Sequence, residues 1–135
     1  GETLDGERLS VSDYRGKVVV VNIWGSWCPP CREEMPDLVA ASKALADDGV
    51  AFVGINTRDT NIVPARQFVK KKGVDYPSIY DPSGRVLLKL RDTVPPTAIP
   101  STLVIDAEGR IAATIFGAAT RKTFEQLALD VAGGQ

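Results

Sequence analysis

VVVVNIWGSWCPPC spans residues 18–31 and combines two structural signals. Its first half, Val18–Trp24, is a continuous run dominated by β-branched residues, which predicts a central strand buried on both faces. Its second half contains Cys28 and Cys31, the only two cysteines in the chain. After Cys31, apolar residues fall at the spacing of one face of a helix. The stretch therefore predicts a buried strand that leads both cysteines to the start of a helix.

The remaining elements can be predicted outward from this stretch. Asp5-Gly6 predicts a small N-terminal hairpin, and the helix after Cys31 should be kinked at Pro36 and end near residues 47–49. Further strands are expected at 50–55, 78–80, 101–106 and 111–116, and further helices at 62–72, at 85–90 and after a Thr120 cap. This order predicts a single α/β domain over residues 1–135, with a mixed central sheet flanked by helices on both faces.

Composition excludes several classes of function. Sixteen Lys and Arg residues against seventeen Asp and Glu residues leave a net charge of -1, too little to attract nucleic acid or anionic lipid. The chain has no histidine and two cysteines, so the ligand sets of a structural zinc site or a Cys/His copper site are missing. No Gly-x-Gly-x-x-Gly fingerprint for a nicotinamide or flavin cofactor occurs. We therefore expect no metal, no cofactor and no nucleic acid, and a small molecule or another protein as partner.

The two cysteines have the spacing of a pair that performs thiol–disulfide exchange. Unpaired N–H groups and the dipole at a helix start favour a thiolate at Cys28, which predicts that it is the nucleophile. Cys31, one turn into the helix, is then the resolving thiol. Pro29 and Pro30 lack N–H groups and fix φ, so they should tune the redox equilibrium. The alternative, a pair of inert buried cysteines, does not account for the flanking Trp27 or the strand-to-helix position.

The chain resembles the TlpA/ResA-like thiol-disulfide oxidoreductases, which are extracytoplasmic bacterial members of the thioredoxin superfamily. The resemblance rests on WGSWCPPCREEMP at 24–36, RGKVVVVN at 15–22 and IPSTLVID at 99–106. It implies a thioredoxin fold with an N-terminal hairpin and a central strand–helix insertion. It also implies a monomer that acts on disulfide-containing proteins and receives electrons from a membrane-borne or other dithiol donor. An extracytoplasmic location follows, with a signal or membrane anchor that is absent from this chain.

The resemblance also assigns a substrate-binding surface. Pro100 matches the cis-proline that faces the cysteine pair throughout the superfamily, although the base rate for X-Pro bonds would predict trans. In the family, the backbone of the preceding residue pairs with an extended substrate segment, which makes Ile99 a substrate-contact candidate. Trp27, Pro29 and Pro30 are expected to contribute to the same surface.

A proton acceptor for the cysteines is harder to assign. Thioredoxin has an aspartate six residues before its first active-site cysteine, whereas this chain has Asn22, an amide that cannot take up a proton at neutral pH. Asp59 matches the acidic residue that follows the second strand in TlpA/ResA-like proteins, and it is the candidate base. It is one methylene shorter than the glutamate expected there. Two alternatives stay open, a solvated loop carboxylate and a cap for the helix starting near Ile62.

Several functions are compatible with these residues. The resemblance implies reduction of extracytoplasmic protein disulfides, with cytochrome c maturation as one such task. One alternative is an oxidant that introduces disulfides into exported proteins. Another is a redox-inactive chaperone or binding module that uses the same apolar surface. A peroxiredoxin is disfavoured, because Gly25 and Val21 occupy the positions where it needs a Thr or Ser and a Pro.

Overall fold

The chain forms one five-stranded mixed sheet in a computed structural model that describes residues 1–134. The strands are β1 (Val18–Trp24), β2 (Val50–Thr57), β3 (Ser78–Asp81), β4 (Ser101–Ile105) and β5 (Ile111–Phe116). They lie in the order β3-β2-β1-β4-β5. β1 is parallel to β2 and antiparallel to β4, β3 is parallel to β2, and β5 is antiparallel to β4. The predicted α/β architecture is thus confirmed.

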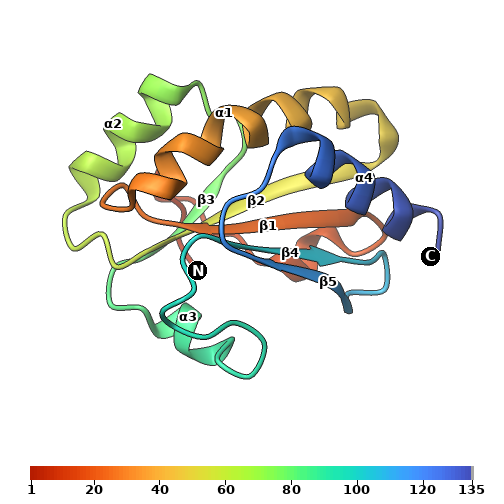
Figure 1. Cartoon of the computed structure of the whole chain (residues 1–135). Coiled ribbons are helices and arrows are strands. Elements are labelled where there is room, and N and C mark those ends of the chain that lie inside the picture. Colours follow the sequence, from red (N-terminus) through yellow and green to blue (C-terminus); the bar gives the residue numbers. More distant parts are fainter. Residues whose placement is uncertain (135) are drawn as a thin grey trace.

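Helices cover both faces of the sheet. They are α1 (Pro29–Ala44), α2 (Ile62–Lys72), α3 (Arg85–Lys89) and α4 (Arg121–Ala132), with short 3-10 turns η1 (Val11–Tyr14) and η2 (Ala46–Asp48). In Figure 1, α1, α2 and α4 lie on one side of the sheet and α3 on the other. β3 and α3 form the predicted strand–helix insertion between α2 and β4. Thr120 caps α4 as expected, its side chain accepting from Thr123 N.

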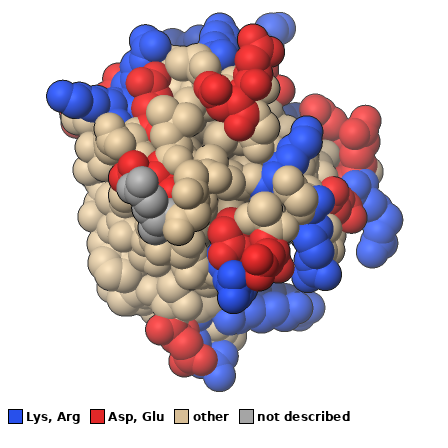
Figure 2. Space-filling view, turned by 90° about the vertical axis from the view of Figure 1, so that its right-hand side faces the viewer, with Lys and Arg blue, Asp and Glu red and all other residues tan. Residues whose placement is uncertain are grey.

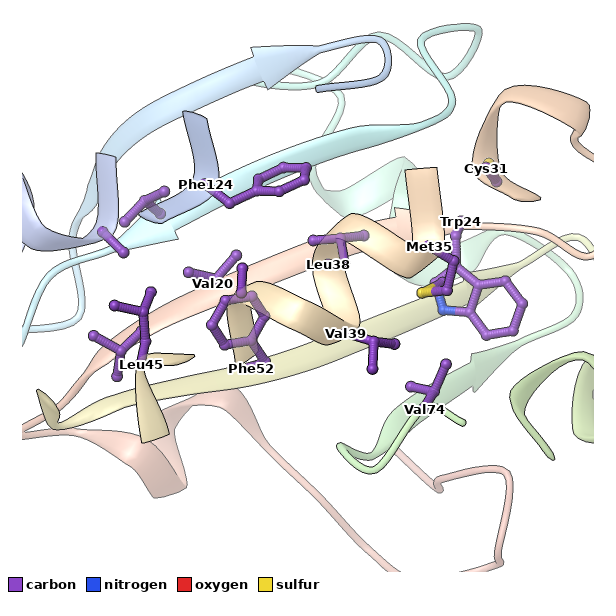
Figure 3. Packing of buried hydrophobic residues seen from close by; sticks show 14 of the residues in the cluster. Val20, Trp24, Cys31, Met35, Leu38, Val39, Leu45, Phe52, Val74 and Phe124 are labelled. Atoms are coloured by element: carbon purple, nitrogen blue, oxygen red, sulfur yellow. The ribbon is translucent and has the colours of Figure 1, made fainter. Parts of the chain in front are cut away.

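The central strand β1 is buried on both faces, which explains its unbroken apolar sequence. Trp24 belongs to the larger core, where it packs with Met35 and Leu38 beneath α1 (Figure 3). On the opposite face, Ile23 belongs to a second core with Leu87 of α3. Trp24 and Ile23 thus anchor the end of β1 on the two faces of the sheet. This fixes the position at which the following loop begins.

The small N-terminal hairpin predicted at Asp5-Gly6 is present. A single antiparallel bridge joins Glu2 to Arg8, and Thr3 N donates to Glu7 O at 2.7 Å. Thr3 also bridges to Ile79 of β3. Leu4 N also donates to Ser78 O at 3.0 Å, and Tyr80 N donates to Glu2 O at 2.7 Å, so the segment covers the edge strand β3 of the sheet.

Several element ends differ from the prediction, most of all those of β2 and α1. β2 continues past residue 55 through Asn56 and Thr57, because their polar side chains are buried with hydrogen-bond partners. α1 begins at Pro29, which is favoured in the first helical turn, and ends at Ala44 before η2. Gly49, with φ of 71°, then turns the chain into β2.

On the face of the molecule that Figure 2 shows, acidic and basic side chains are interspersed. Among residues 1–134, none of the helices has the length and apolar character required to cross a bilayer.

Candidate functional site

The two cysteines form a disulfide at the start of α1. β1 ends at Trp24, a three-residue loop follows, and Cys28 is the N-cap of the helix. Cys28 and Cys31 are 2% and 1% exposed, and Cys31 N donates to Cys28 Sγ at 3.2 Å. The predicted helix-start position of Cys28 is confirmed, and the geometry suits a sulfur that becomes a thiolate on reduction.

Two prolines occupy the first two helical positions, Pro29 at N1 and Pro30 at N2. Both are exposed at the surface beside the disulfide. An N-cap side chain normally accepts from the N–H of N2 or N3, and Pro30 removes the first of these donors. Cys31 N–H is therefore the one capping donor available to the Cys28 sulfur.

The segment before β4 contacts the disulfide through its backbone. The Ile99–Pro100 bond is cis, as the resemblance implied. Cys28 Sγ lies 3.9 Å from Ile99 O. The sulfur carries no proton in the disulfide, so this is a van der Waals contact that becomes a weak S–H···O hydrogen bond in the reduced thiol. Pro100 O accepts from Gly117 N at 2.8 Å, which ties the segment to the end of β5.

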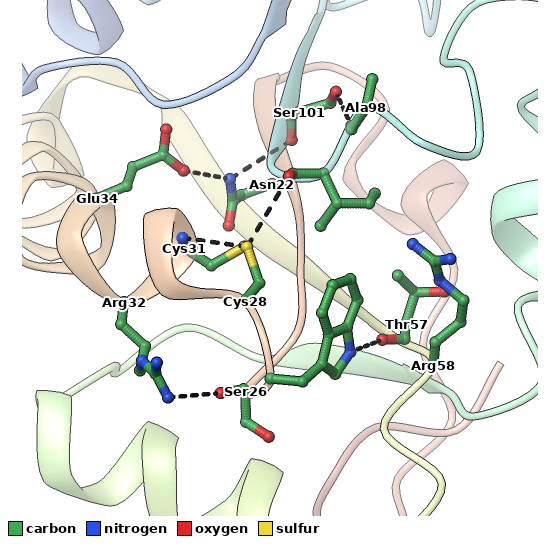
Figure 4. The surroundings of a disulfide bond; sticks show 12 residues. Asn22, Ser26, Cys28, Cys31, Arg32, Glu34, Thr57, Arg58, Ala98 and Ser101 are labelled. Carbon is green, nitrogen blue, oxygen red and sulfur yellow. Dashed lines mark hydrogen bonds between the residues drawn. A yellow bond between two sulfur atoms is a disulfide. The ribbon is translucent and has the colours of Figure 1, made fainter.

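Trp27 lies on the exposed side of the loop. It is 43% exposed, whereas Trp24 is fully buried. The indole Nε1 donates to Thr57 O at 3.1 Å, and the Arg58 guanidinium lies 4.9 Å from the ring centroid. The dashed line that ends at Thr57 in Figure 4 marks the first of these contacts. The apolar face of Trp27 is thereby fixed next to Cys28.

Asp59 is buried and anchors the same loop. Its carboxylate accepts from Ser26 N at 2.8 Å, from Ser26 Oγ at 2.6 Å and from Asn56 Nδ2 at 2.7 Å. Within residues 1–134, none of its hydrogen bonds involves a cysteine. Both alternatives for this residue are wrong, because Asp59 is 6% exposed and the N-cap of α2 is Asn61. Its contacts make it a positioning residue, while its role as a base stays a prediction.

The Asp59→Asn variant separates the two roles. An amide can keep these hydrogen bonds, since its oxygen can accept from Ser26 N and Asn56 Nδ2 and its NH₂ group can donate to Ser26 Oγ. It loses the negative charge that strengthens them, so the free energy of unfolding should fall by about 1 kcal/mol. Exchange should slow at every pH with an unchanged profile shape. Urea unfolding and a pH–rate series measure both quantities. A profile whose inflection disappears while stability is retained would instead assign the proton transfer to Asp59.

Glu34 is a site residue that the sequence analysis missed. It lies three residues after Cys31 on α1 and is 3% exposed. Its Oε1 accepts from Asn22 Nδ2 at 3.0 Å (Figure 4). Its Oε2 accepts from Ala119 N at 2.8 Å. Burial raises the pKa of Glu34 to about 7, although the hydrogen bonds from Ala119 and Asn22 act in the opposite direction. A buried carboxyl that titrates near neutral pH is suited to proton exchange.

Asn22 connects this carboxyl to the strands below the disulfide. Its Nδ2 also lies 3.2 Å from Thr102 Oγ1 of β4, and among residues 1–134 its Oδ1 has no hydrogen-bond partner. An amide can donate to a carboxylate or, after rotation, accept from a carboxylic acid. Asn22 can therefore pair with Glu34 in either protonation state. Where thioredoxin has an acid, this chain therefore has an amide that pairs with a glutamate of α1.

Residues 1–134 contain no group of three or more His, Cys, Asp or Glu side chains placed to hold a metal ion. The geometry around Cys28 and Cys31 supports the chemistry of a dithiol–disulfide couple. Thiol–disulfide exchange needs an attacking sulfur and a second sulfur within reach, and Cys28 at the helix start and Cys31 one turn away provide them. The half-buried Ile99 and the buried acid Glu34 lie around this pair.

Comparison with known proteins agrees with this chemistry. The family model described as Redoxin matches residues 2–129. The thiol-disulfide oxidoreductase ResA of Bacillus subtilis (strain 168) is 33% identical over 119 residues, which cover 88% of this chain. The match spans 64% of the ResA protein, so the chain corresponds to less than two thirds of that relative.

Solved structures agree equally well. A secreted thiol-disulfide isomerase from Corynebacterium glutamicum superposes with a TM-score of 0.92 and 38% identity, covering 98% of this chain and 82% of the other. A DsbF homologue from Corynebacterium diphtheriae gives a TM-score of 0.87 and 40% identity, covering 96% and 81% of the two chains. The match to these folds extends over nearly all of the sheet and helices described above.

Proposed function

We infer the function of this chain from its family, since it belongs to the Redoxin family and, within it, to the TlpA/ResA-like thiol-disulfide oxidoreductases of the thioredoxin superfamily. We propose that it reduces disulfides in other proteins through the Cys28–Cys31 couple. The observation that carries the proposal is the disulfide at the N-cap of α1, 3.9 Å from the backbone of the cis Ile99–Pro100 segment.

The reduced protein acts in two exchange steps. The Cys28 thiolate attacks one sulfur of the substrate disulfide, forms a mixed disulfide and releases the first substrate thiolate. Cys31 then loses its proton and attacks Cys28 Sγ, which releases the second substrate thiolate and closes the Cys28–Cys31 disulfide. Two electrons pass to the substrate, and its two thiolates take up protons. A second dithiol protein restores the reduced pair by the reverse exchange.

Glu34 is our candidate for the proton acceptor of the second step. Residues three apart on a helix share a face, so Glu34 neighbours Cys31, and both are buried. Its carboxyl has a pKa of about 7, so a large fraction is ionised and able to take a proton at neutral pH. Asn22 then pairs with the protonated form. Asp59 contributes by holding the loop at Ser26.

The two prolines favour a reductant over an oxidant. A strong oxidant of this superfamily stabilises its reduced form, that is, its nucleophilic thiolate. In this chain Pro30 has no N–H to donate at N2. Of the two usual capping donors, the Cys28 sulfur therefore has one, the Cys31 N–H at N3. A less stabilised thiolate makes the reduced state less favourable, and the protein donates electrons more readily.

Pro30→Ala tests this explanation. The variant restores an N–H at N2 that can stabilise the Cys28 thiolate, and a tenfold shift of the equilibrium toward the reduced form raises the reduction potential by about 30 mV. Pro29→Ala is the matched control, because the N1 N–H is not a usual partner of the N-cap side chain. Equilibration with glutathione gives both potentials. A shift of the same size in the two variants, or one toward more negative potentials in Pro30→Ala, would show that the prolines act in another way.

Substrates and partners follow from the same surface. The exposed Trp27 and the Ile99 backbone suit an extended polypeptide, so the proposed substrates are disulfide-containing proteins. We further propose an extracytoplasmic location, a membrane-borne or other dithiol donor, and a monomeric protein. The location is supported by the secreted relative from Corynebacterium glutamicum.

Insulin reduction with dithiothreitol tests the activity directly. The wild-type protein should accelerate the precipitation of the insulin B chain, and the variant lacking both cysteines should not. Equal rates with the two proteins would contradict an enzymatic role and favour a redox-inactive binding module. Catalysed oxidative refolding of a reduced substrate, without insulin reduction, would favour the oxidant.

A further inference from the structure

We propose that Arg58 is a positioning residue that holds Trp27 and the segment 94–100 together as one binding surface for substrate polypeptides. The proposal rests on the proposed function, because it explains how the disulfide is presented to a protein substrate. Arg58 affects the affinity for large substrates and does not take part in the exchange reaction at the sulfurs.

The backbone of Arg58 has an unusual conformation. Its φ is 57°, and within residues 1–134 it is the single non-glycine residue with a positive φ. This left-handed region is disfavoured for a long side chain, so the surrounding structure must maintain it. Arg58 N donates to Asp81 O at 2.8 Å, and the Asp81 carboxylate is itself held by Thr57 Oγ1 at 2.9 Å. A disfavoured backbone conformation that is held by hydrogen bonds indicates a positional role for this residue.

The side chain of Arg58 contacts two segments that flank the disulfide. Its guanidinium carbon lies 4.9 Å from the ring centroid of Trp27, which is cation–π distance. Its Nη2 donates to Pro96 O at 3.2 Å. Trp27 directly precedes Cys28, and the segment containing Pro96 continues to the Ile99 carbonyl beside the Cys28 sulfur. Arg58 is thus the link between the two parts of the proposed substrate surface.

The indole of Trp27 is confined on three sides. Nε1 donates to Thr57 O at 3.1 Å, the guanidinium of Arg58 covers the ring, and a Cβ added at Gly25 would overlap the indole. The segment 94–98 has no regular secondary structure, so the contact with Arg58 restricts a backbone that is otherwise free of ladder hydrogen bonds. Ordering both parts before the substrate arrives lowers the entropy lost on binding. Loss of Arg58 should therefore affect KM more than kcat.

Arg58→Asn is the sharpest variant, because asparagine tolerates the left-handed backbone and removes the guanidinium. We expect the KM for insulin to rise about fivefold with kcat within about twofold, as disorder at a binding surface weakens affinity. Reduction of a small disulfide such as cystine should not change. The acrylamide quenching constant of the exposed tryptophan should rise about twofold. Arg58→Lys keeps the cation and should recover part of the insulin affinity.

Arg110→Asn is the control. Arg110 lies in the turn between β4 and β5 and pairs with Asp106 and Glu108, so its loss removes a surface arginine away from the disulfide. It should leave every constant at the wild-type value. The proposal would be overturned if Arg58→Asn left the KM for insulin and the quenching constant unchanged, or if it lowered the activity toward insulin and cystine equally. A wild-type protein without activity would contradict the proposed function, and the quenching constant would still decide whether Arg58 holds Trp27.

Discussion

The Cys31→Ser variant is expected to accumulate a mixed disulfide between Cys28 and its substrate, and Cys28→Ser to lose exchange altogether. The reason is the position of each sulfur. Cys28 caps α1 and accepts from Cys31 N, whereas Cys31 lies one turn inside the helix with 1% exposure. A thiolate forms more readily at the helix start, and without Cys31 the mixed disulfide has no thiol to resolve it.

Non-reducing gels with a disulfide-containing substrate detect the trapped complex, and the double serine variant is the control. Iodoacetamide labelling of the reduced wild-type protein at neutral pH, followed by peptide mass analysis, gives the relative reactivity of the two thiols. Faster labelling of Cys31 than of Cys28, or a complex formed by Cys28→Ser, would reverse the assignment.

The Glu34→Gln variant is expected to slow resolution of the mixed disulfide by about 100-fold, which is the lower range of general acid–base effects. Glutamine keeps the size of the side chain but cannot accept the Cys31 proton. The inflection in the pH–rate profile near the Glu34 pKa, about 7 in the wild-type protein, should disappear. Stopped-flow kinetics with a preformed mixed disulfide isolates this step.

Glu33→Gln is the matched control, because Glu33 is the preceding residue on α1 and is exposed. Its rate constants and pH profile should equal those of the wild-type protein. A Glu34→Gln variant that keeps the wild-type inflection would remove Glu34 from proton transfer. The Asp59→Asn series would then decide whether that residue supplies the base.

The pH dependence of the free energy of unfolding provides an independent test of the raised pKa of Glu34. Burial raises its pKa from 4.5 to about 7, so the folded state holds the proton more tightly than the unfolded state. The contribution of the protonated form is fully present below pH 4.5 and is lost as the pH rises through about 7, a change of about 3 kcal/mol. Urea unfolding should show this loss in the wild-type protein, and Glu34→Gln should lack it.

Much of the fold could be predicted because its signals are local. The β-branched run of β1 and the cap at Thr120 act through nearest neighbours along the chain, and both elements occur where expected. The extension of β2 through Asn56 could not be predicted, since the partner that allows its burial is the side chain of Asp59 beyond the strand. The cis bond before Pro100 came from the family resemblance, because no local signal specifies it.

The sequence predicts the two cysteines of the candidate site, but it does not predict all of the residues around them. The spacing of Cys28 and Cys31 can be recognised from the amino-acid sequence alone. Glu34 was missed because a charged residue among apolar positions of α1 resembles a solvated side chain, and only the tertiary structure shows that it is buried against Asn22 and Ala119. Its spacing of three residues from Cys31, together with the amide at position 22, was the signal available in the sequence.

The reduction potential of the Cys28–Cys31 couple tests the central claim, that this protein is a reductant of protein disulfides. It is measured by equilibrating the wild-type protein with glutathione buffers of defined ratio and quantifying the two thiols. We predict a value nearer that of thioredoxin, about -270 mV, than that of the strong oxidant DsbA, about -120 mV. A value near the DsbA end, accompanied by catalysed oxidative refolding of a reduced substrate, would contradict the claim and assign disulfide formation instead.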